Sequence, residues 1–330
     1  MTSCTYDIVT LTPNPSIDRT VTIDASLSPG GVHRIIHELR EPGGKGLNVA
    51  AVARESGSTV CAIVPLGPDD PLGDLADVPV RAVAIDQQVR TNIAVIDADG
   101  ETTKINEAGP AFTPEHVDAL LEAIREEARH ARCVVLAGSL PTGVDDDFYI
   151  RAVTAIRHDA PDVLVAVDTS DRPLMRLAES LPDAAPDIVK PNAKELAQMV
   201  GADPDAMEAA ADAGNFAPVI EAARGLVARG IDTVVATLGG AGAIAVTAEE
   251  AWHATAPDVP VRSTVGAGDA SLTGYLLSRL RNDDVATCLA HACAYGSAAA
   301  ALPGTGRPRP TDIRPDESTL TDLTKGSHHE

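Results

Sequence analysis

The residues whose types and spacing could most clearly carry out a reaction are Thr264-Val265-Gly266-Ala267-Gly268-Asp269-Ala270, which lead into an apolar, helix-like run. Its glycines permit backbone conformations that other residues avoid, so several amide groups can converge on one point where the predicted helix begins. These first amides have no partners within the helix and lie at the positive end of its dipole, which favours an anion. A phosphoryl group held there, with the carboxylate of Asp269 beside it, would suit a phosphotransferase. Taken alone, Asp269 fits equally well as a helix cap after a glycine turn.

The elements that must position this stretch follow an alternating pattern. Short apolar runs recur along the chain, and each of the later ones is followed by helix-compatible sequence, with a long helix expected at residues 284–302. This alternation is typical of parallel strands joined by helical crossovers, and it predicts an α/β fold with a mostly parallel sheet. The predicted buried strands are residues 6–11, 59–65, 133–137, 163–167, 187–189 and 233–237.

Polar residues follow most of these predicted strands. In a doubly wound sheet, ligands bind beyond the carboxyl ends of the strands, so residues at these positions are expected to converge. That convergence is a stronger signal than any single residue. The residues concerned are Asn14 and Asp18, Gly138 and Ser139, Asp168, Lys190 with Asn192 and Glu195, Thr237 to Gly240, and Gly266 to Asp269.

A smaller sheet is expected outside the main one. Residues 20–24 alternate polar and apolar side chains, and residues 91–105 read as two strands joined by a turn at residues 97–100. We expect a β lid built from about residues 17–37 and 80–107, whereas residues 67–79 are too rich in Pro, Gly and Asp to predict a full helix. The main domain with its lid would span residues 1–312, and a C-terminal tail would follow at residues 313–330.

Composition and charge exclude several classes of function. The net charge of −22 and the isoelectric point near 4.6 argue against nucleic acid or an anionic membrane surface as partners. No segment resembles a signal peptide, and no apolar run reaches the roughly 20 residues of a membrane span. The five cysteines are scattered and lack metal-binding spacing, so we expect buried free thiols and a cytoplasmic location.

Two familiar nucleotide-binding motifs are absent. In Gly43-Gly44-Lys45-Gly46 the lysine is followed by glycine instead of serine or threonine, so this loop is not a P-loop. The stretch from Thr237 to Gly242 lacks the last glycine of a dinucleotide fingerprint and the later acidic residue. A nicotinamide-dependent oxidoreductase is therefore not expected.

In these motifs the chain resembles the ribokinase-like carbohydrate kinases, in the phosphofructokinase-B branch that contains 1-phosphofructokinase and tagatose-6-phosphate kinase. The resemblance covers about residues 6–312 and implies a three-layer α/β/α, doubly wound fold with a small β lid. Each stretch is weak alone, but together and in this order they are specific. The matching stretches are Thr10 to Asp18, Pro42 to Asn48, Arg90 to Asn92, Gly138 to Pro141, Lys190 to Glu195, Thr237 to Gly242, and Val265 to Asp269.

The resemblance implies roles in phosphoryl transfer from ATP. Asp269 would accept the proton of the sugar hydroxyl, and the amides of Gly266, Ala267 and Gly268 would stabilise the transferred phosphoryl group. Asn192 and Glu195, spaced by three on one helix face, would hold Mg²⁺ directly or through water, which suits a hard oxygen ligand. The same two residues also fit a helix capping box. The residues implied in binding ATP are Lys190, Thr237, Leu238, Gly239, Gly240, Gly242 and Gly268.

For the sugar, the resemblance implies a ketohexose phosphate, with fructose 1-phosphate converted to fructose 1,6-bisphosphate as the expected reaction. Tagatose 6-phosphate and fructose 6-phosphate are the competing substrates. Lys45, Arg34 and Arg90 are the cations expected at the sugar's phosphate, which a kinase of neutral sugars would not need. The positions implied in binding the rest of the sugar are Asn14, Asp18, Gly43, Gly44, Asn48 and Ser139.

Two further possibilities remain open at this point. A sugar-phosphate sensor without catalytic activity could keep the same fold, although the intact Gly-Ala-Gly-Asp and Asn-x-x-Glu motifs argue against it. The edges of the small lid sheet could pair between two subunits, so a homodimer is an expected assembly.

Overall fold

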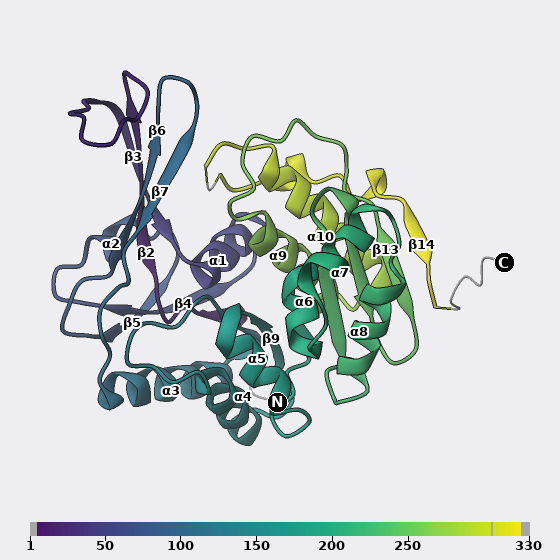
Figure 1. Ribbon diagram of the computed structural model, residues 1–330. Coiled ribbons are helices and arrows are strands. Elements are labelled where there is room, and N and C mark those ends of the chain that lie inside the picture. The colour runs from purple at the N-terminus through teal and green to yellow at the C-terminus, as the bar shows by residue number, and fades with distance from the viewer. Residues whose placement is uncertain (1–4, 305, 325–330) are drawn as a thin grey trace.

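The computed structural model describes residues 5–304 and 306–324, which form a large sheet, a small sheet and the helices around them (Figure 1). The large sheet has the strand order β14-β13-β12-β11-β10-β9-β8-β1-β4-β5. Neighbouring strands from β5 to β11 are parallel, and those from β11 to β14 are antiparallel. The strands are β1 (Tyr6–Leu11), β4 (Val60–Leu66), β5 (Val80–Ala84), β8 (Ala131–Ala137), β9 (Leu164–Asp168), β10 (Ile188–Val189), β11 (Thr233–Thr237), β12 (Ala243–Val246), β13 (Ala251–Ala254) and β14 (Leu320–Asp322).

The central strands are buried on both faces, which explains their continuous apolar sequence. In β8, six of the seven residues are buried, and β4 has a similar pattern. All six strands predicted from apolar runs are present, and their parallel pairing confirms the predicted doubly wound sheet.

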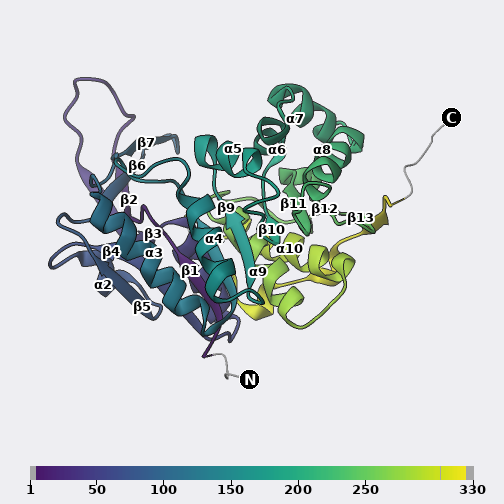
Figure 2. The same cartoon turned by 90° about the horizontal axis from the view of Figure 1, so that it is seen from below.

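Helices cover both faces of this sheet, so the fold has the expected three layers (Figures 1 and 2). One hydrophobic cluster packs α3, α4, α5, α6 and α8 against one face, and a second packs α1, α9 and α10 against the other. The expected helix near the C-terminus is α10. The α-helices are α1 (Lys45–Glu55), α2 (Pro71–Leu75), α3 (Pro114–Ala128), α4 (Phe148–Asp159), α5 (Asp171–Glu179), α6 (Ala193–Val200), α7 (Pro204–Asp212), α8 (Ala217–Val227), α9 (Ala267–Leu280) and α10 (Val285–Ala300).

The small sheet projects from the main body beside α1 and forms the lid (Figure 1). Its order is β3-β2-β6-β7, with β2 and β6 parallel and the other pairs antiparallel. β2 begins shortly after β1, and β3 ends directly before α1, so the base of the lid lies next to the carboxyl end of β1. The lid strands are β2 (Ser16–Ile23), β3 (Ile35–Gly43), β6 (Arg90–Ile96) and β7 (Thr102–Asn106).

Two boundaries of the predicted lid are wrong. Residues 80–84 form β5, which pairs in parallel with β4 at the edge of the large sheet. The lid also extends to Gly43, because β3 continues through Pro42-Gly43, which the sequence placed in a glycine-rich loop. Short apolar runs do not reveal which sheet they join, because pairing depends on partners distant in sequence.

Residues 313–324, the described part of the predicted C-terminal tail, are not separate from the main domain. β14 pairs antiparallel with β13 and adds an edge strand to the large sheet, and Leu323 packs against the core. Residues 71–75 form only the single short turn α2, as the composition of this segment suggested.

Two further expectations concern the core and the membrane. Four cysteines, Cys61, Cys133, Cys288 and Cys293, are free and buried, as predicted, while Cys4 lies outside the described residues. Within residues 5–304 and 306–324, none of the helices has the length and apolar character needed to cross a bilayer.

Candidate active site

The glycine-containing stretch forms the start of α9, as the sequence predicted. Gly266 caps the helix in the left-handed conformation, with φ of 77°, and places the first amides of the helix at one point. The amide of Ala267 makes only a long 3.4 Å bond to the carbonyl of Thr264. Gly268 faces a cation, since a side-chain carbon at this position would lie 3.3 Å from the Lys190 Nζ atom. The helix start is therefore suited to an anion.

Asp269 lies in the first turn of α9 and does not cap the helix. Its side chain is buried, with 6% of the residue exposed, and its Oδ2 atom accepts a 2.8 Å hydrogen bond from the Asn48 side-chain amide. Burial, and then the negative charge of Asp168, raise the pKa of Asp269 to about 6, while Lys45, Asn48 and Lys190 act in the opposite direction. A carboxylate with this pKa is well matched to general-base catalysis near neutral pH.

A buried ion cluster lies beside this carboxylate. Asp168, the last residue of β9, accepts a 2.8 Å bond from the Lys45 Nζ atom and pairs with the Lys190 Nζ atom at 3.1 Å. Burial alone would raise the pKa of Asp168, but the two ammonium groups outweigh it and the pKa is lowered. The sequence placed Asp168 at a strand end without assigning it a role.

The sugar side of the site is built at the base of the lid. Asn14 lies within 3.4 Å of the Ser139 hydroxyl, and the Asp18 carboxylate accepts hydrogen bonds from Ser16 and Asn92. Ser16 and Asn92 were not predicted as site residues, although Asn92 lies in a matching stretch. The register of β2 with β6, which pairs Asp18 with Asn92, brings them together.

The glycines of the loop before α1 are required by close packing. A side-chain carbon on Gly43 would lie 2.5 Å from the Asp18 carboxylate, and Gly44 has a φ of 126°. Gly43 is therefore needed for the close approach of β3 to Asp18, and Gly44 for its left-handed backbone beside Thr12.

Several buried polar atoms of this region have no hydrogen-bond partner among the described residues. They are Asn14 Oδ1, Arg90 Nε and Asn92 Oδ1. Unpaired buried polar groups are costly, so their gathering in one region indicates a polar ligand.

Arg90 is half-buried at this place. Its guanidinium donates to the carbonyl oxygen of Asn14 at 3.3 Å and, at 3.5 Å, to that of Glu107. Burial lowers the pKa of Arg90, and the charge of Asp18 opposes this effect. An arginine held by carbonyl oxygens and lacking an ion pair among the described residues suits the binding of an anion.

The three cations expected at the sugar phosphate do not meet within one chain. The ammonium group of Lys45 pairs with Asp168, whereas the guanidinium of Arg90 donates to the carbonyl oxygens of Asn14 and Glu107. Arg34 is exposed and directly precedes β3, whose opposite end carries Gly43. With about 3.3 Å per strand residue, Arg34 lies about 30 Å along the lid from Gly43.

A cavity of about 620 Å³ lies between the start of α9, the second half of α10 and the loop after β11. Its lining includes Thr237, Gly239, Gly240, Gly242 and Gly268, all predicted to bind the nucleotide. Small residues of α10 complete the wall. One end of the cavity is lined by Ala267 and Gly268 at the start of α9, beside the Lys190 ammonium group. The triphosphate of the nucleotide is expected at this end.

At two residues the structure differs from the predicted nucleotide site. Leu238 is buried in the hydrophobic core, so only its backbone lies near the loop. His253, which the sequence did not single out, contacts the carbonyl oxygen of Ala241 through its Nε2 atom at 2.7 Å and stacks on Phe216. This contact anchors the loop that lines the cavity.

At the start of α6, one of the two carboxylate oxygens of Glu195 is available to bind Mg²⁺. Asn192 and Glu195 form a reciprocal capping box, with both bonds at 2.8 Å, which occupies one carboxylate oxygen of Glu195. The other oxygen has no hydrogen bond to a described residue. No group of three or more His, Cys, Asp or Glu side chains in residues 5–304 and 306–324 could hold a metal ion. A single free carboxylate oxygen suits Mg²⁺, which is held by few protein oxygens together with water and substrate phosphates.

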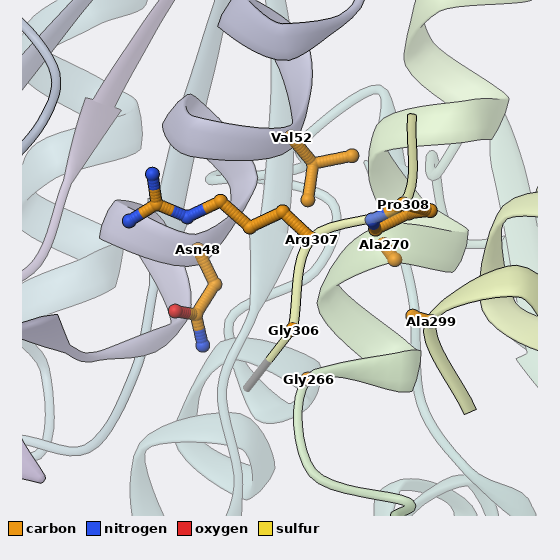
Figure 3. A pocket seen from close by; sticks show the side chains of 8 residues that line it. All are labelled: Asn48, Val52, Gly266, Ala270, Ala299, Gly306, Arg307 and Pro308. Atoms are coloured by element: carbon orange, nitrogen blue, oxygen red, sulfur yellow. The ribbon is translucent and has the colours of Figure 1, made fainter. Parts of the chain in front are cut away.

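The segment at residues 306–308 closes the site from the side of α1 (Figure 3). Arg307 extends past Asn48 across α1 and forms a 2.6 Å ion pair with Asp77. Gly306 and Pro308 line a small pocket together with Asn48 and with Gly266 and Ala270 at the start of α9, so this segment lies between the starts of α1 and α9. The sequence offered no signal for this contact.

Comparison with known proteins agrees with this geometry. A family model described as pfkB family carbohydrate kinase matches residues 11–312. The chain is 35% identical to a 1-phosphofructokinase of Haloferax volcanii over 317 residues, which cover 94% of this chain and 96% of that protein. It is also 35% identical to a 1-phosphofructokinase of Xanthomonas campestris over 272 residues, or 81% of this chain and 82% of that protein.

Solved structures show the same fold. Phosphofructokinase-2 from Escherichia coli in complex with potassium superposes with a TM-score of 0.82 and 30% identity, covering 93% of this chain and 96% of that chain. A ribokinase of Arabidopsis thaliana, complexed with ribose and ATP, has a TM-score of 0.68 at 19% identity, covering 93% of this chain and 95% of that chain. The latter likeness concerns the fold alone and agrees with the expected ribokinase-like architecture.

Proposed function

Because the chain belongs to the pfkB family of carbohydrate kinases, which transfer a phosphoryl group from ATP with Mg²⁺, we propose that its acceptor is a ketohexose phosphate. The proposed reaction converts fructose 1-phosphate and ATP to fructose 1,6-bisphosphate and ADP. Relatives at 32–35% identity that carry the name 1-phosphofructokinase support this substrate. The observation that carries the substrate class is the set of buried, unpaired polar atoms on Asn14, Arg90 and Asn92, which suits a hydroxylated anion.

In the proposed mechanism, Asp269 accepts the proton of the sugar's 6-hydroxyl group, with Asn48 holding the carboxylate in place. The hydroxyl oxygen then forms a bond to the γ-phosphorus of ATP, and the bond from that phosphorus to the bridging oxygen of ADP breaks. The amides at Gly266 to Gly268 and the ammonium group of Lys190 stabilise the charge on the transferred group.

Asn192 and Glu195 are the residues that would hold Mg²⁺, directly or through water. When bound, the ion would neutralise charge on the phosphate oxygens. The nucleotide would occupy the cavity next to Gly239, Gly240 and Gly242, where the loop backbone lies against its wall.

A coupled assay of ADP release tests this proposal with fructose 1-phosphate, tagatose 6-phosphate, fructose 6-phosphate and free fructose. We expect the highest kcat/KM with fructose 1-phosphate. A preference for either 6-phosphate would replace the proposed substrate within the same class. Equal use of free fructose would identify a neutral-sugar kinase instead. Calorimetric binding of sugar phosphates without turnover of any acceptor would identify a sensor.

We also propose that two chains associate through their lids. β3 is an edge strand, and its exposed residues include Ile35, Ile36 and Leu39, with Ile36 64% exposed. An exposed apolar edge strand favours pairing with a second chain. Arg34 could then serve the sugar phosphate of the other chain, because it lies far from Gly43 in its own. A phosphofructokinase-2 from Escherichia coli has a tetrameric inhibited form, which supports association in this family.

The cellular setting proposed for this enzyme is the cytoplasm, where ATP and sugar phosphates are available. The four buried free thiols suit a reducing compartment.

A further inference from the structure

Asp168 is the most buried charged residue of the site, with 1% exposed. Its Oδ1 atom accepts a 2.8 Å bond from Lys45, and its Oδ2 atom pairs with Lys190 at 3.1 Å. The three residues come from three separate elements, because Lys45 begins α1, Asp168 ends β9 and Lys190 follows β10. Both oxygens of one carboxylate therefore hold ammonium groups from different parts of the chain.

The two ammonium groups face the place where phosphoryl transfer would occur. The Lys190 Nζ atom lies 3.3 Å from the position that a side chain on Gly268 would take. Lys45 lies close enough to Asp269 and Glu195 for both carboxylates to raise its pKa, in addition to Asp168, against the effect of burial. One cation thus lies at the helix start, and the other lies within electrostatic reach of both the base and the residue assigned to Mg²⁺.

We propose that Asp168 is a positioning residue of the kinase reaction: it holds Lys45 and Lys190 on two sides of the transferred phosphoryl group and keeps both from pairing with Asp269. This inference rests on the proposed function. The two carboxylate oxygens of Asp168 face Lys45 and Lys190, so in this proposal Asp168 acts through the lysines and not by touching a substrate.

Electrostatics supply the reason for this arrangement. The buried ammonium group of Lys190 and the partly buried one of Lys45 would repel each other without the carboxylate between them, and the charge of Asp269 also acts on Lys45. An ammonium group bound to Asp269 would compete with the substrate hydroxyl for the base. In the described residues, Asp269 instead has the neutral amide of Asn48 as its side-chain partner.

The first measurement is the Asp168→Asn variant, which keeps the shape of the side chain but removes its charge. We expect kcat to fall by about 10²-fold, the scale seen when a preorganised charge-stabilising group is lost. The KM for the sugar and the calorimetric Kd for ATP should change by less than about threefold, because in this proposal neither substrate contacts Asp168. The control is Asp171→Asn, which removes an exposed carboxylate at the start of α5, three residues after Asp168, and should leave kcat unchanged.

A double-mutant cycle with Lys45→Met separates a positioning role from a merely structural one. The fold-loss of kcat caused by Asp168→Asn should be at least about ten times smaller in the Lys45→Met background than in the wild type, because only Lys190 is then left for Asp168 to position. Equal losses in both backgrounds would overturn the inference. The double variant also has one ammonium group fewer beside position 168, so it can be compared with Lys45→Met even where Asp168→Asn alone fails to fold.

The remaining alternative is that Asp168 is a metal ligand. In that case, Asp168→Asn would shift the Mg²⁺ titration to higher concentrations, and its effect would be independent of Lys45; this result contradicts the inference. All comparisons use whichever acceptor the wild-type enzyme phosphorylates. A failure with fructose 1-phosphate would therefore count against the proposed substrate without deciding the role of Asp168.

Discussion

The side-chain amide of Asn48, in the first turn of α1, donates a 2.8 Å hydrogen bond to the carboxylate of Asp269, in the first turn of α9. The two residues are 221 positions apart in sequence. This bond occupies one oxygen of the base and leaves the other to receive a proton. It also couples the loop at the base of the lid to the phosphoryl site, because Asn48 is only four residues after Gly44.

Replacement of Asp269 by asparagine should lower kcat by about 10²-fold or more, because the amide cannot accept the proton of the sugar hydroxyl. Steady-state kinetics and calorimetry would show the loss of kcat with nearly unchanged ATP binding. The matched control is Asp212→Asn on the exposed end of α7, which should behave as wild type. Retention of more than about a tenth of wild-type kcat would remove Asp269 from the proposed role.

The pH dependence of kcat/KM should report the ionisation of Asp269. Its pKa in the folded protein is raised to about 6, so the active carboxylate form is lost as the pH falls through about 6. We expect kcat/KM to be level above this value and to fall about tenfold per pH unit well below it. In Asn48→Leu, loss of the bond that favours the carboxylate should move this limb to higher pH. A profile that stays level down to pH 5 would contradict the assignment.

Replacement of Glu195 by glutamine should raise the Mg²⁺ concentration needed for half-maximal activity. Glutamine can keep the capping box with Asn192, so the start of α6 and the melting temperature should be preserved. A Mg²⁺ titration of initial rates, with a thermal melt as control, makes the measurement. Superimposed titration curves of variant and wild type would leave Glu195 with its capping role alone.

Replacement of Arg90 by lysine should raise the KM for the sugar phosphate at least about tenfold, which corresponds to about 1.4 kcal/mol. Charge is conserved, but a lysine cannot present the paired donors that arginine offers to a phosphate. The KM for ATP should change little, and added salt should weaken sugar-phosphate binding. Arg129→Lys on the protein surface serves as the control. A silent Arg90→Lys variant would show that the phosphate binds elsewhere.

Introduction of a charge into the edge of the lid, as in Ile36→Glu, should prevent pairing of two lids. Light scattering after gel filtration should show a dimer for the wild type and a monomer for the variant. Glu249→Gln, on the exposed turn after β12, is the control for a surface change away from the lid. A monomeric wild-type protein would rule out the proposed assembly. If the dimer serves catalysis, Arg34→Ala should raise the KM for the sugar phosphate only in the dimeric protein.

Local patterns in the sequence were sufficient to predict the α/β class, the buried strands and the position of Asp269 after a glycine turn. Burial on both faces of a parallel strand selects continuous apolar runs, and a helix start with glycines is recognisable within a few residues. The carboxyl ends of parallel strands meet at one edge, so the convergence of Asn14, Ser139, Lys190 and Asp269 could also be expected before any contact was known.

Only the tertiary structure decided which side chains pair. Lys45 stands in a glycine-rich loop and was expected at the sugar phosphate, yet the packing of α1 against β1 and β8, the neighbours of β9 in the sheet, brings it to Asp168. Arg34 was expected beside Arg90, but the straight run of β3 carries it to the far end of the lid. Residues 80–84 read as a lid strand and instead extend the large sheet. Sequence patterns record whether a residue is buried, whereas the choice of partner depends on distances between segments that are remote in the chain.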